Sequence, residues 1–264
     1  MSSNNEQYLN IFDYVSKSNV SVEEKVKAII KNNPTPFMLR IFLYQNSELL
    51  TPEMCLYLVE KHPEFFNESI LHQLIKSTTR NNAADKKKET MYVKRLYTAF
   101  LHCSNFNVKT ALKFLRYLHF NHSPLVAECT KEDIKLIKRI CQFTLSYDAL
   151  VELYWIVSIR KNVFSVKTQT SNTITQSHSA KALLDAHLSE EKKKEDENYI
   201  KQLEDIYTSY VVKYITSPRF HIALKHNGAR KIRRINEIYQ SCNIQDKNVE
   251  DIITTAMVLM EVKD

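Results

Sequence analysis

Residues 226–240, HNGARKIRRINEIYQ, hold a cluster of cationic side chains of the type that binds phosphate groups. Arg230, Lys231, Arg233 and Arg234 fill four of five consecutive positions. Arginine binds phosphate oxygens through paired hydrogen bonds, and neutralising the charge of a nucleic acid also releases its condensed counterions. The cluster therefore predicts a surface that binds a polyanion.

The same segment has the apolar spacing of an amphipathic helix. Ile232, Ile235 and Ile238 recur at helical intervals, so one face can be buried while the arginines face outward. The single glycine of the chain, Gly228, precedes this helix. Asn227-Gly228 is typical of a helix end at which glycine adopts the left-handed conformation. We therefore expect Gly228 to form the corner that directs the basic helix.

A simpler interpretation of the arginine row is a solvated face that is partly paired with acidic residues elsewhere. Residues 185–205 contain eight acids and four lysines, and so carry the opposite charge. Runs of charge are usually solvated, and exposed ion pairs contribute little to stability. The sequence leaves both interpretations open.

A second basic region lies in the middle of the chain. Residues 81–166 contain fourteen Lys and Arg against seven Asp and Glu. If successive helical hairpins stack, the helical spacing of these residues aligns their cations into a positive strip suited to RNA. The predicted binding residues of this strip are Lys86, Lys87, Lys88, Lys94, Arg95, Lys109, Lys113, Arg116, Lys131, Lys135, Lys138 and Arg139.

Aromatic residues are interleaved with these cations. Exposed aromatics stack on unpaired bases in proteins that bind single-stranded RNA, whereas aromatics at helical spacing more often fill a core. We expect Phe100, Phe114 and Phe120 in the core and leave Tyr92 and Tyr117 open. A separate apolar stripe predicts that Trp155 is also a core residue.

No arrangement of nucleophiles, bases or metal ligands indicates an enzyme. One glycine in 264 residues is far below the usual ~7%, which argues against Rossmann, P-loop and nucleophile-elbow folds. His119 and His122 have a spacing that offers two zinc ligands, but a second pair is missing, so we expect ordinary histidines. The carboxylates Glu132 and Asp133 fall in a first helical turn, where they complement the helix dipole. We expect no catalytic residue, no metal and no cofactor.

The cysteines are odd in number, scattered and never arranged as CxxC. Such a set predicts reduced thiols in an intracellular protein, buried in apolar surroundings that leave them inert. The five are Cys55, Cys103, Cys129, Cys141 and Cys242.

Helix start signals recur along the chain and indicate an all-α fold. Ser21 opens a capping box, and Thr35-Pro36 and Thr51-Pro52 each place a hydroxyl before a proline at the first helical position. The same pattern is repeated at Ser217-Pro218, Thr130 and Asn248. The expected helices are 6–17, 21–32, 36–46, 52–62, 67–80, 86–104, 108–121, 131–146, 147–163, 179–215, 218–241 and 248–262. Short connections between them predict stacked helical hairpins, as a repeat-like array or an irregular bundle.

Composition suggests three parts. Residues 1–165 form an N-terminal helical body, and residues 166–179, VKTQTSNTITQSHS, have the polarity of a flexible linker. Residues 180–264 form a C-terminal helical unit with an acidic and a basic helix. No stretch is apolar enough to span a membrane, and the first residues resemble neither a signal peptide nor a presequence. We expect an intracellular protein of the nucleus, cytoplasm or mitochondrion, of unknown oligomeric state.

Two functions fit this pattern. The first is a non-catalytic nucleic-acid-binding protein, with RNA as the partner, acting in RNA processing, stability or translation. The second is a protein–protein adaptor or scaffold for an acidic partner, which uses the same basic helical surface. An enzyme whose active-site residues the sequence does not reveal is the third and least supported alternative.

Overall fold

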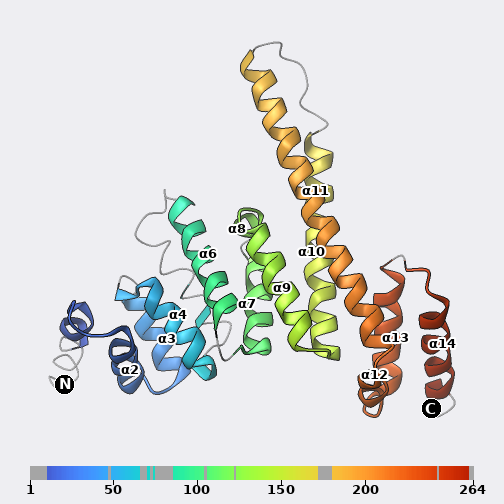
Figure 1. Ribbon diagram of the computed structural model, residues 1–264, viewed down its shortest axis with the longest axis horizontal. Helices are drawn as coiled ribbons and strands as arrows, with labels where there is room; N and C mark the ends of the chain where they lie inside the picture. The colour runs from blue at the N-terminus through green and yellow to red at the C-terminus, as the bar shows by residue number, and fades with distance from the viewer. Residues whose placement is uncertain are drawn as a thin grey trace. The chain divides into compact units, whose positions relative to one another are not determined.

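A computed structural model describes residues 11–46, 49–65, 70, 71, 74, 86–103, 106–121, 123–171, 180–242 and 244–261. The elements formed by these residues are helices, with no strand among them, so the predicted all-α class is confirmed (Figure 1). The helices are α2 (Val22–Asn32), α3 (Pro36–Gln45), α4 (Pro52–Lys61), the short 3₁₀ helix η2 (Pro63–Phe65), α6 (Lys86–His102), α7 (Val108–Asn121), α8 (Ser123–Ala127), α9 (Thr130–Phe143), α10 (Tyr147–Ser171), α11 (Ala180–Ile215), α12 (Pro218–Leu224), α13 (Gly228–Gln240) and α14 (Lys247–Glu261).

The first three start signals act as predicted. The Ser21 hydroxyl accepts a hydrogen bond from the backbone N–H of Glu24, and the Glu24 carboxylate accepts one from the backbone N–H of Ser21. The hydroxyls of Thr35 and Thr51 each accept a hydrogen bond from the N–H three residues on, at 3.3 Å. These bonds satisfy backbone donors that the first helical turn leaves without partners.

The three later start signals act differently. The Ser217 side chain makes no capping hydrogen bond, and Thr130 is already the first residue of α9. At α14 the cap is Asp246, whose Oδ1 accepts hydrogen bonds from the N–H groups of Asn248 and Val249 at 3.0 and 3.2 Å. Aspartate caps a helix as well as asparagine does, and here the cap is Asp246 and not Asn248.

The chain divides into two compact units, Met1–Leu136 and Ile137–Asp264. In the first unit, α2 contacts α4, α4 contacts α6, and α8 contacts both α6 and α7. The contacts of α2 with α4 and of α4 with α6 join helices that are not consecutive in the chain, as in a stack of helical hairpins.

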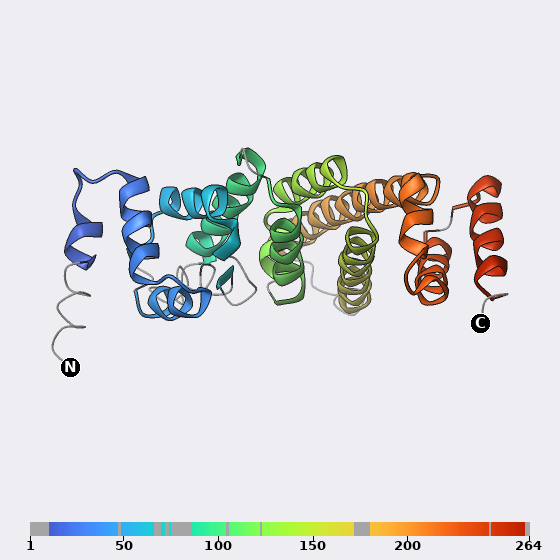
Figure 2. The same ribbon diagram turned by 90° about the horizontal axis from the view of Figure 1, so that it is seen from below.

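In the second unit, α10 and α11 form a long antiparallel hairpin (Figure 1). The following helices pack in order, because α12 contacts α13 and α13 contacts α14, as Figure 2 shows from another side. Tyr210 ties α11 to the start of α10, since its hydroxyl oxygen accepts a hydrogen bond from the Ser146 N–H at 2.9 Å. Burial raises the pKa of Tyr210 to about 12.

These units do not coincide with the predicted parts of the chain. Helix α10 continues to Ser171, so residues 166–171 of the predicted linker are helical, and residues 172–179 lie outside the described residues. Helix α11 packs along α10, so the contacts place residues 147–165 in the same unit as the acidic helix. The polar composition of 166–171 favoured a linker, but a helix that carries on from an apolar start tolerates polar residues in its last turns.

Candidate nucleic-acid interface

Helix α13 presents the arginine cluster, and its start differs from the prediction. The single helix expected over 218–241 is interrupted after Leu224. Asn227, rather than Gly228, adopts the left-handed conformation, with φ 54° and ψ 41°. Gly228 is the first residue of α13, and a Cβ atom there would lie 2.4 Å from the Met260 sulfur of α14. The Met260 side chain therefore packs directly against Gly228, while asparagine, which tolerates a positive φ, forms the corner.

The amphipathic character predicted for this helix is confirmed. Ile232, Ile235 and Ile238 are buried, with Ile235 and Ile238 fully inaccessible to solvent. On the other side, Arg230 and Arg233 are exposed. Burial of the isoleucine row thus fixes which side of α13 faces solvent.

Lys231 has a structural contact inside the unit. Its Nζ donates a hydrogen bond to the Ala223 carbonyl of α12 at 2.8 Å and lies 5.5 Å from the centre of the Tyr147 ring of α10. A cation held by a carbonyl and an aromatic ring links three helices. The charge of Lys231 is therefore already engaged by contacts within the fold.

Arg234 lies on an aromatic platform of α10. Its guanidinium carbon is 4.5 Å from the ring centre of Tyr154 and 5.2 Å from that of Trp155. It also donates a hydrogen bond to the Glu237 carboxylate at 2.6 Å. Arg234 is thereby held in one orientation between α10 and its own helix.

Trp155 is 43% exposed, so its predicted place in the core is wrong. The buried positions of α10 include Leu150, Leu153 and Ile156, and Trp155 lies two residues, or about 200° of helical rotation, from Leu153. The ring therefore stands on the side of α10 that faces Arg234.

A groove of about 650 Å³ runs between α10 and α13. Trp155, Arg230, Arg233 and Arg234 contribute to its walls. Acidic residues line it as well: Asp148, Glu152 and Glu237. The groove therefore combines one arginine that is held in place, two exposed arginines and an aromatic ring. Its carboxylates balance the positive charge, so the surface is not uniformly positive.

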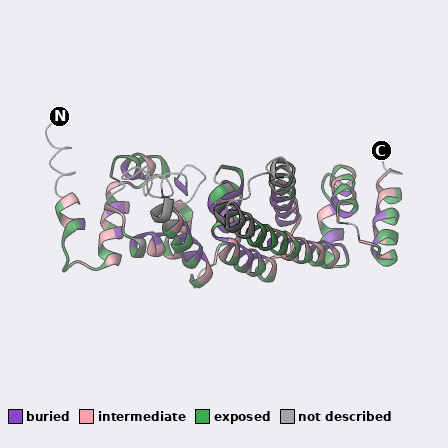
Figure 3. Cartoon of the chain, turned by 90° about the horizontal axis from the view of Figure 1, so that it is seen from above, coloured by how far each residue is buried: buried purple, intermediate pink, exposed green. Residues whose placement is uncertain are grey.

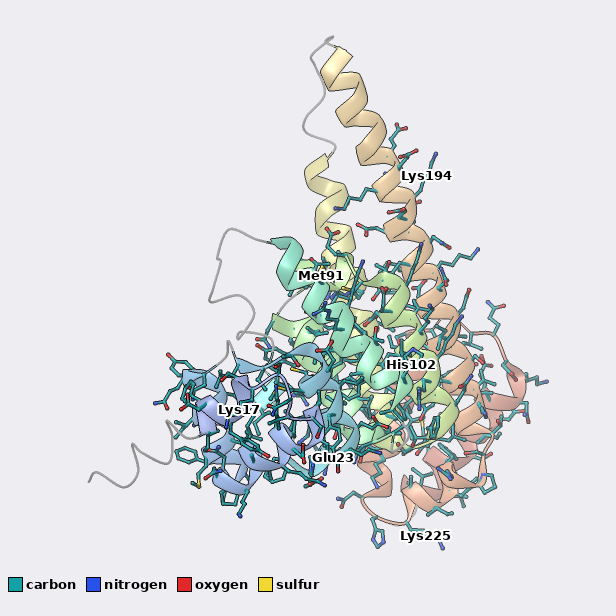
Figure 4. The ribbon with its side chains drawn as sticks, turned by 60° about the vertical axis from the view of Figure 1, so that its left-hand side comes forward. Lys17, Glu23, Met91, His102, Lys194 and Lys225 are labelled. Atoms are coloured by element: carbon teal, nitrogen blue, oxygen red, sulfur yellow. The ribbon has the colours of Figure 1, made fainter. Side chains whose placement is uncertain are left out.

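The arginines of α13 do not pair with the described acidic residues of α11. Among residues 190–205, whose side chains the structure describes, none forms an ion pair with Arg230, Arg233 or Arg234. The described acid Glu204 pairs instead with Lys161 of α10. Much of this segment of α11 is exposed, and Lys194 points away from the helix (Figures 3 and 4).

The predicted strip in the middle of the chain contains mostly exposed cations. Those on the surface are Lys94, Arg95, Lys109, Arg116, Lys131, Lys135 and Lys138, whereas Lys113 and Arg139 are half-buried. Lys86, Lys87 and Lys88 begin α6, but their side chains lie outside the described part. Because Lys138 and Arg139 belong to the second unit and the others to the first, a single strip across all of them stays a prediction.

Exposed aromatics next to arginine are a feature that the sequence reasoning missed. Phe120 is 53% exposed, with the Arg116 guanidinium 5.9 Å from its ring centre, and Phe143 is 60% exposed, with Arg139 at 5.3 Å. The prediction that Phe120 is a core residue is therefore wrong. Six residues separate it from the buried Phe114, about 240° around the helix, while Arg116 is four residues away and shares its face. This Arg-x-x-x-Phe spacing was the available signal.

The core predictions for the neighbouring aromatics are confirmed. Phe100 and Phe114 are buried and stacked, with ring centres 4.8 Å apart, and Tyr97 packs edge-on against Phe114 at 5.1 Å. Tyr117, left open, is also buried, and burial raises its pKa to about 12. The side chain of Tyr92 lies outside the described residues.

His119 and Asp133 belong to a buried polar cluster. The Tyr97 hydroxyl donates a hydrogen bond to Asp133 Oδ1 at 2.6 Å, and His119 Nε2 lies 3.0 Å from the same oxygen. Both His119 and Asp133 are fully inaccessible to solvent. Asp133 lies in the first turn of α9, as predicted, and its side chain also turns inward and joins α6, α7 and α9.

Ligands for a metal are not gathered in the described part of the chain. No group of three or more His, Cys, Asp and Glu residues is placed there to hold an ion. His122 lies outside the described residues. Likewise, no described helix combines the length and apolar character needed to cross a membrane.

Three of the cysteines lie in surroundings that suppress ionisation of their thiols. None of the five, all of which are described, forms a disulfide. Burial raises the pKa of the thiols of Cys129 and Cys141 to about 12. Burial also raises the pKa of Cys242.

We expect native Cys129 and Cys141 to react with iodoacetamide at pH 8 on the order of 10³ times more slowly than in urea. The thiolate is the reactive form, and an ordinary cysteine ionises near pH 8.5. Because the unfolded thiols ionise at lower pH than the folded ones, the same burial makes unfolding easier as the pH rises from about 8.5 towards 12. Mass spectrometry of alkylated peptides measures the ratio, and equal rates in the native and denatured protein would contradict the burial.

Comparison of the chain with known protein families, curated proteins and solved structures finds no match.

Proposed function

We propose that the protein is a non-catalytic RNA-binding protein that acts in RNA processing, stability or translation. The proposed binding surface of the second unit is the α13 side of the groove between α10 and α13, and the basic faces of α7 and α9 are proposed as separate phosphate-binding surfaces.

The observation that carries the proposal is the state of Arg230 and Arg233. Both side chains are exposed, and neither forms an ion pair within the described part of the chain. They stand beside Trp155 in the same groove. Proteins bind single-stranded nucleic acid with cationic groups that hold the phosphates and with aromatic rings on which the bases stack. Arg230, Arg233 and Trp155 offer both.

Helix α9 gives independent support. Lys131, Lys135 and Lys138 are exposed at helical intervals along one face, without a described ion pair. Lysines in such a row attract a phosphate backbone without reading its sequence.

The experiment is a salt titration of RNA binding with Arg230→Gln and Arg233→Gln combined. For single-stranded RNA, the logarithm of the association constant falls with the logarithm of salt concentration by about 0.7 per phosphate contacted. Loss of two contacts should weaken binding and reduce the slope by about 1.4. Fluorescence anisotropy of a labelled oligoribonucleotide measures both quantities.

The matched control replaces Lys25 and Lys31 of α2 with glutamine. Lys31 is exposed and Lys25 is half-buried, and their replacement changes the net charge by the same amount. If both double variants lose affinity equally, the effect is one of net charge and the groove is not the binding surface. If the wild-type protein binds no RNA at low salt, the proposed function is refuted.

A protein–protein adaptor remains the second candidate because α3 exposes a large apolar face. Phe37, Met38, Ile41 and Tyr44 are all exposed there. Exposed apolar patches of this kind mark interaction surfaces, and binding through them depends little on salt. A partner protein whose affinity is insensitive to salt and is lost on replacing Phe37 and Ile41 with serine would favour the adaptor.

A further inference from the structure

We propose that Trp155 is a stacking platform for one unpaired base, so that the groove selects single-stranded over duplex RNA. The inference rests on the proposed RNA binding and adds the class of substrate. The phosphates that flank the stacked base bind Arg230 and Arg233.

The contacts around Trp155 restrain its ring and leave part of it accessible. Tyr154 packs edge-on against it, with ring centres 5.6 Å apart and an angle of 66° between the ring planes. Arg234 lies 5.2 Å from its centre and is itself held by Glu237. Although these neighbours restrain the indole, 43% of the residue stays accessible to solvent. A large aromatic ring that is restrained yet accessible loses little conformational freedom when a base stacks on it.

The charge of the groove favours a short single-stranded segment over a duplex. Asp148, Glu152 and Glu237 balance the three arginines of the lining, and the Arg234 charge is already paired with Glu237. Because positive and negative side chains are equal in number in this groove, we expect it to bind the rigid duplex, with its two phosphate backbones, weakly. A flexible strand can instead place one base on the ring and two phosphates on the exposed arginines.

The volume of the groove is also large enough for a nucleotide. The groove holds about 650 Å³, within the ~300–1,000 Å³ range of pockets that enclose small ligands. A nucleotide with its neighbouring phosphate fits such a space, whereas a helical duplex can only span its mouth.

Trp155 is the only tryptophan of the chain, so its intrinsic fluorescence reports on this groove alone. The full-length protein is titrated with a ten-nucleotide oligoadenylate RNA, with the same strand annealed to its complement, and with heparin. Oligoadenylate should quench the Trp155 emission at concentrations that track binding measured by anisotropy. The duplex and heparin should bind without comparable quenching.

Two variants test the contribution of the ring. Trp155→Leu should weaken binding of the single strand by roughly 5- to 150-fold, while Trp155→Tyr, which keeps an aromatic face, should recover most of the affinity. Far-UV circular dichroism checks that both variants are folded. The quenching titration uses the wild-type protein and so does not depend on either variant.

The outcomes separate this inference from the proposed function. Salt-dependent binding of oligoadenylate without quenching, or with equal affinity in the leucine variant, overturns base stacking and leaves RNA binding in place. Equal quenching by the duplex also overturns it. Absence of any RNA binding refutes the function and the stacking together.

Discussion

Replacing Asp133 with alanine should lower the free energy of unfolding by about 3–5 kcal/mol. The Asp133 carboxylate is fully buried and accepts the Tyr97 hydroxyl at 2.6 Å, with His119 Nε2 at 3.0 Å. Its removal deprives two buried polar groups of their acceptor, and breaking a buried charge-paired group costs of this order. Urea denaturation followed by circular dichroism measures the change.

A graded pair of variants separates the charge of Asp133 from its hydrogen bonds. Asp133→Asn keeps one acceptor oxygen and should cost less than the alanine variant, about 1–3 kcal/mol. Glu132→Ala is the matched control, because Glu132 is the neighbouring acid in the same turn of α9 and is only half-buried. Alkylation of Cys129, which is buried directly before α9, reports locally on this part of the chain. Equal stability of the Asp133 and Glu132 alanine variants would show that the cluster does not hold the three helices together.

Replacing Ile235 with alanine should destabilise the second unit by about 2–5 kcal/mol. Ile235 is fully buried on the side of α13 opposite the exposed arginines. Its truncation removes buried apolar surface and leaves a cavity between helices that cannot close completely. The emission of Trp155, which lies in the same unit, follows the unfolding transition in urea.

The control for Ile235 is Gln240→Ala, an exposed position near the end of the same helix, which should change stability by less than about 0.5 kcal/mol. RNA binding by the Ile235 variant should be normal at temperatures where it is folded and should disappear with unfolding. The Arg230 and Arg233 double variant should lose affinity without losing stability. If Ile235→Ala is as stable as the control, the isoleucine row does not anchor α13 and the orientation of its arginines has another cause.

Local signals explain how much of the fold could be predicted. Helix starts at Ser21, Thr35 and Thr51 were found because a hydroxyl three residues before a backbone N–H is a contact within one turn. The buried row of α13 was found because helical spacing alone places Ile232, Ile235 and Ile238 together. Interactions of this kind involve residues close in sequence, so they can be recognised without the fold.

Side chains whose environment depends on another helix were predicted less well. Asp133 was correctly assigned to a first helical turn, but its contacts in the interior with Tyr97 of α6 and His119 of α7 were not predicted. Trp155 and Phe120 were assigned to the core because they are large and apolar, but each lies on a helix face that carries an arginine contact. Hydrophobicity predicts that a residue is buried on average and does not tell which residue at a helix surface is left exposed.

The sequence by itself determined the all-α class, the positions of most helices and the two-sided character of α13, because these follow from capping and from periodicity along one chain segment. Only the tertiary structure decided that Arg234 is held on Tyr154 and Trp155, that Lys231 is engaged by α12, and that Arg230 and Arg233 stay exposed beside an aromatic ring. The sequence shows where the cations are. Whether each one can bind a phosphate depends on the contacts that it makes when α10, α12 and α13 pack together.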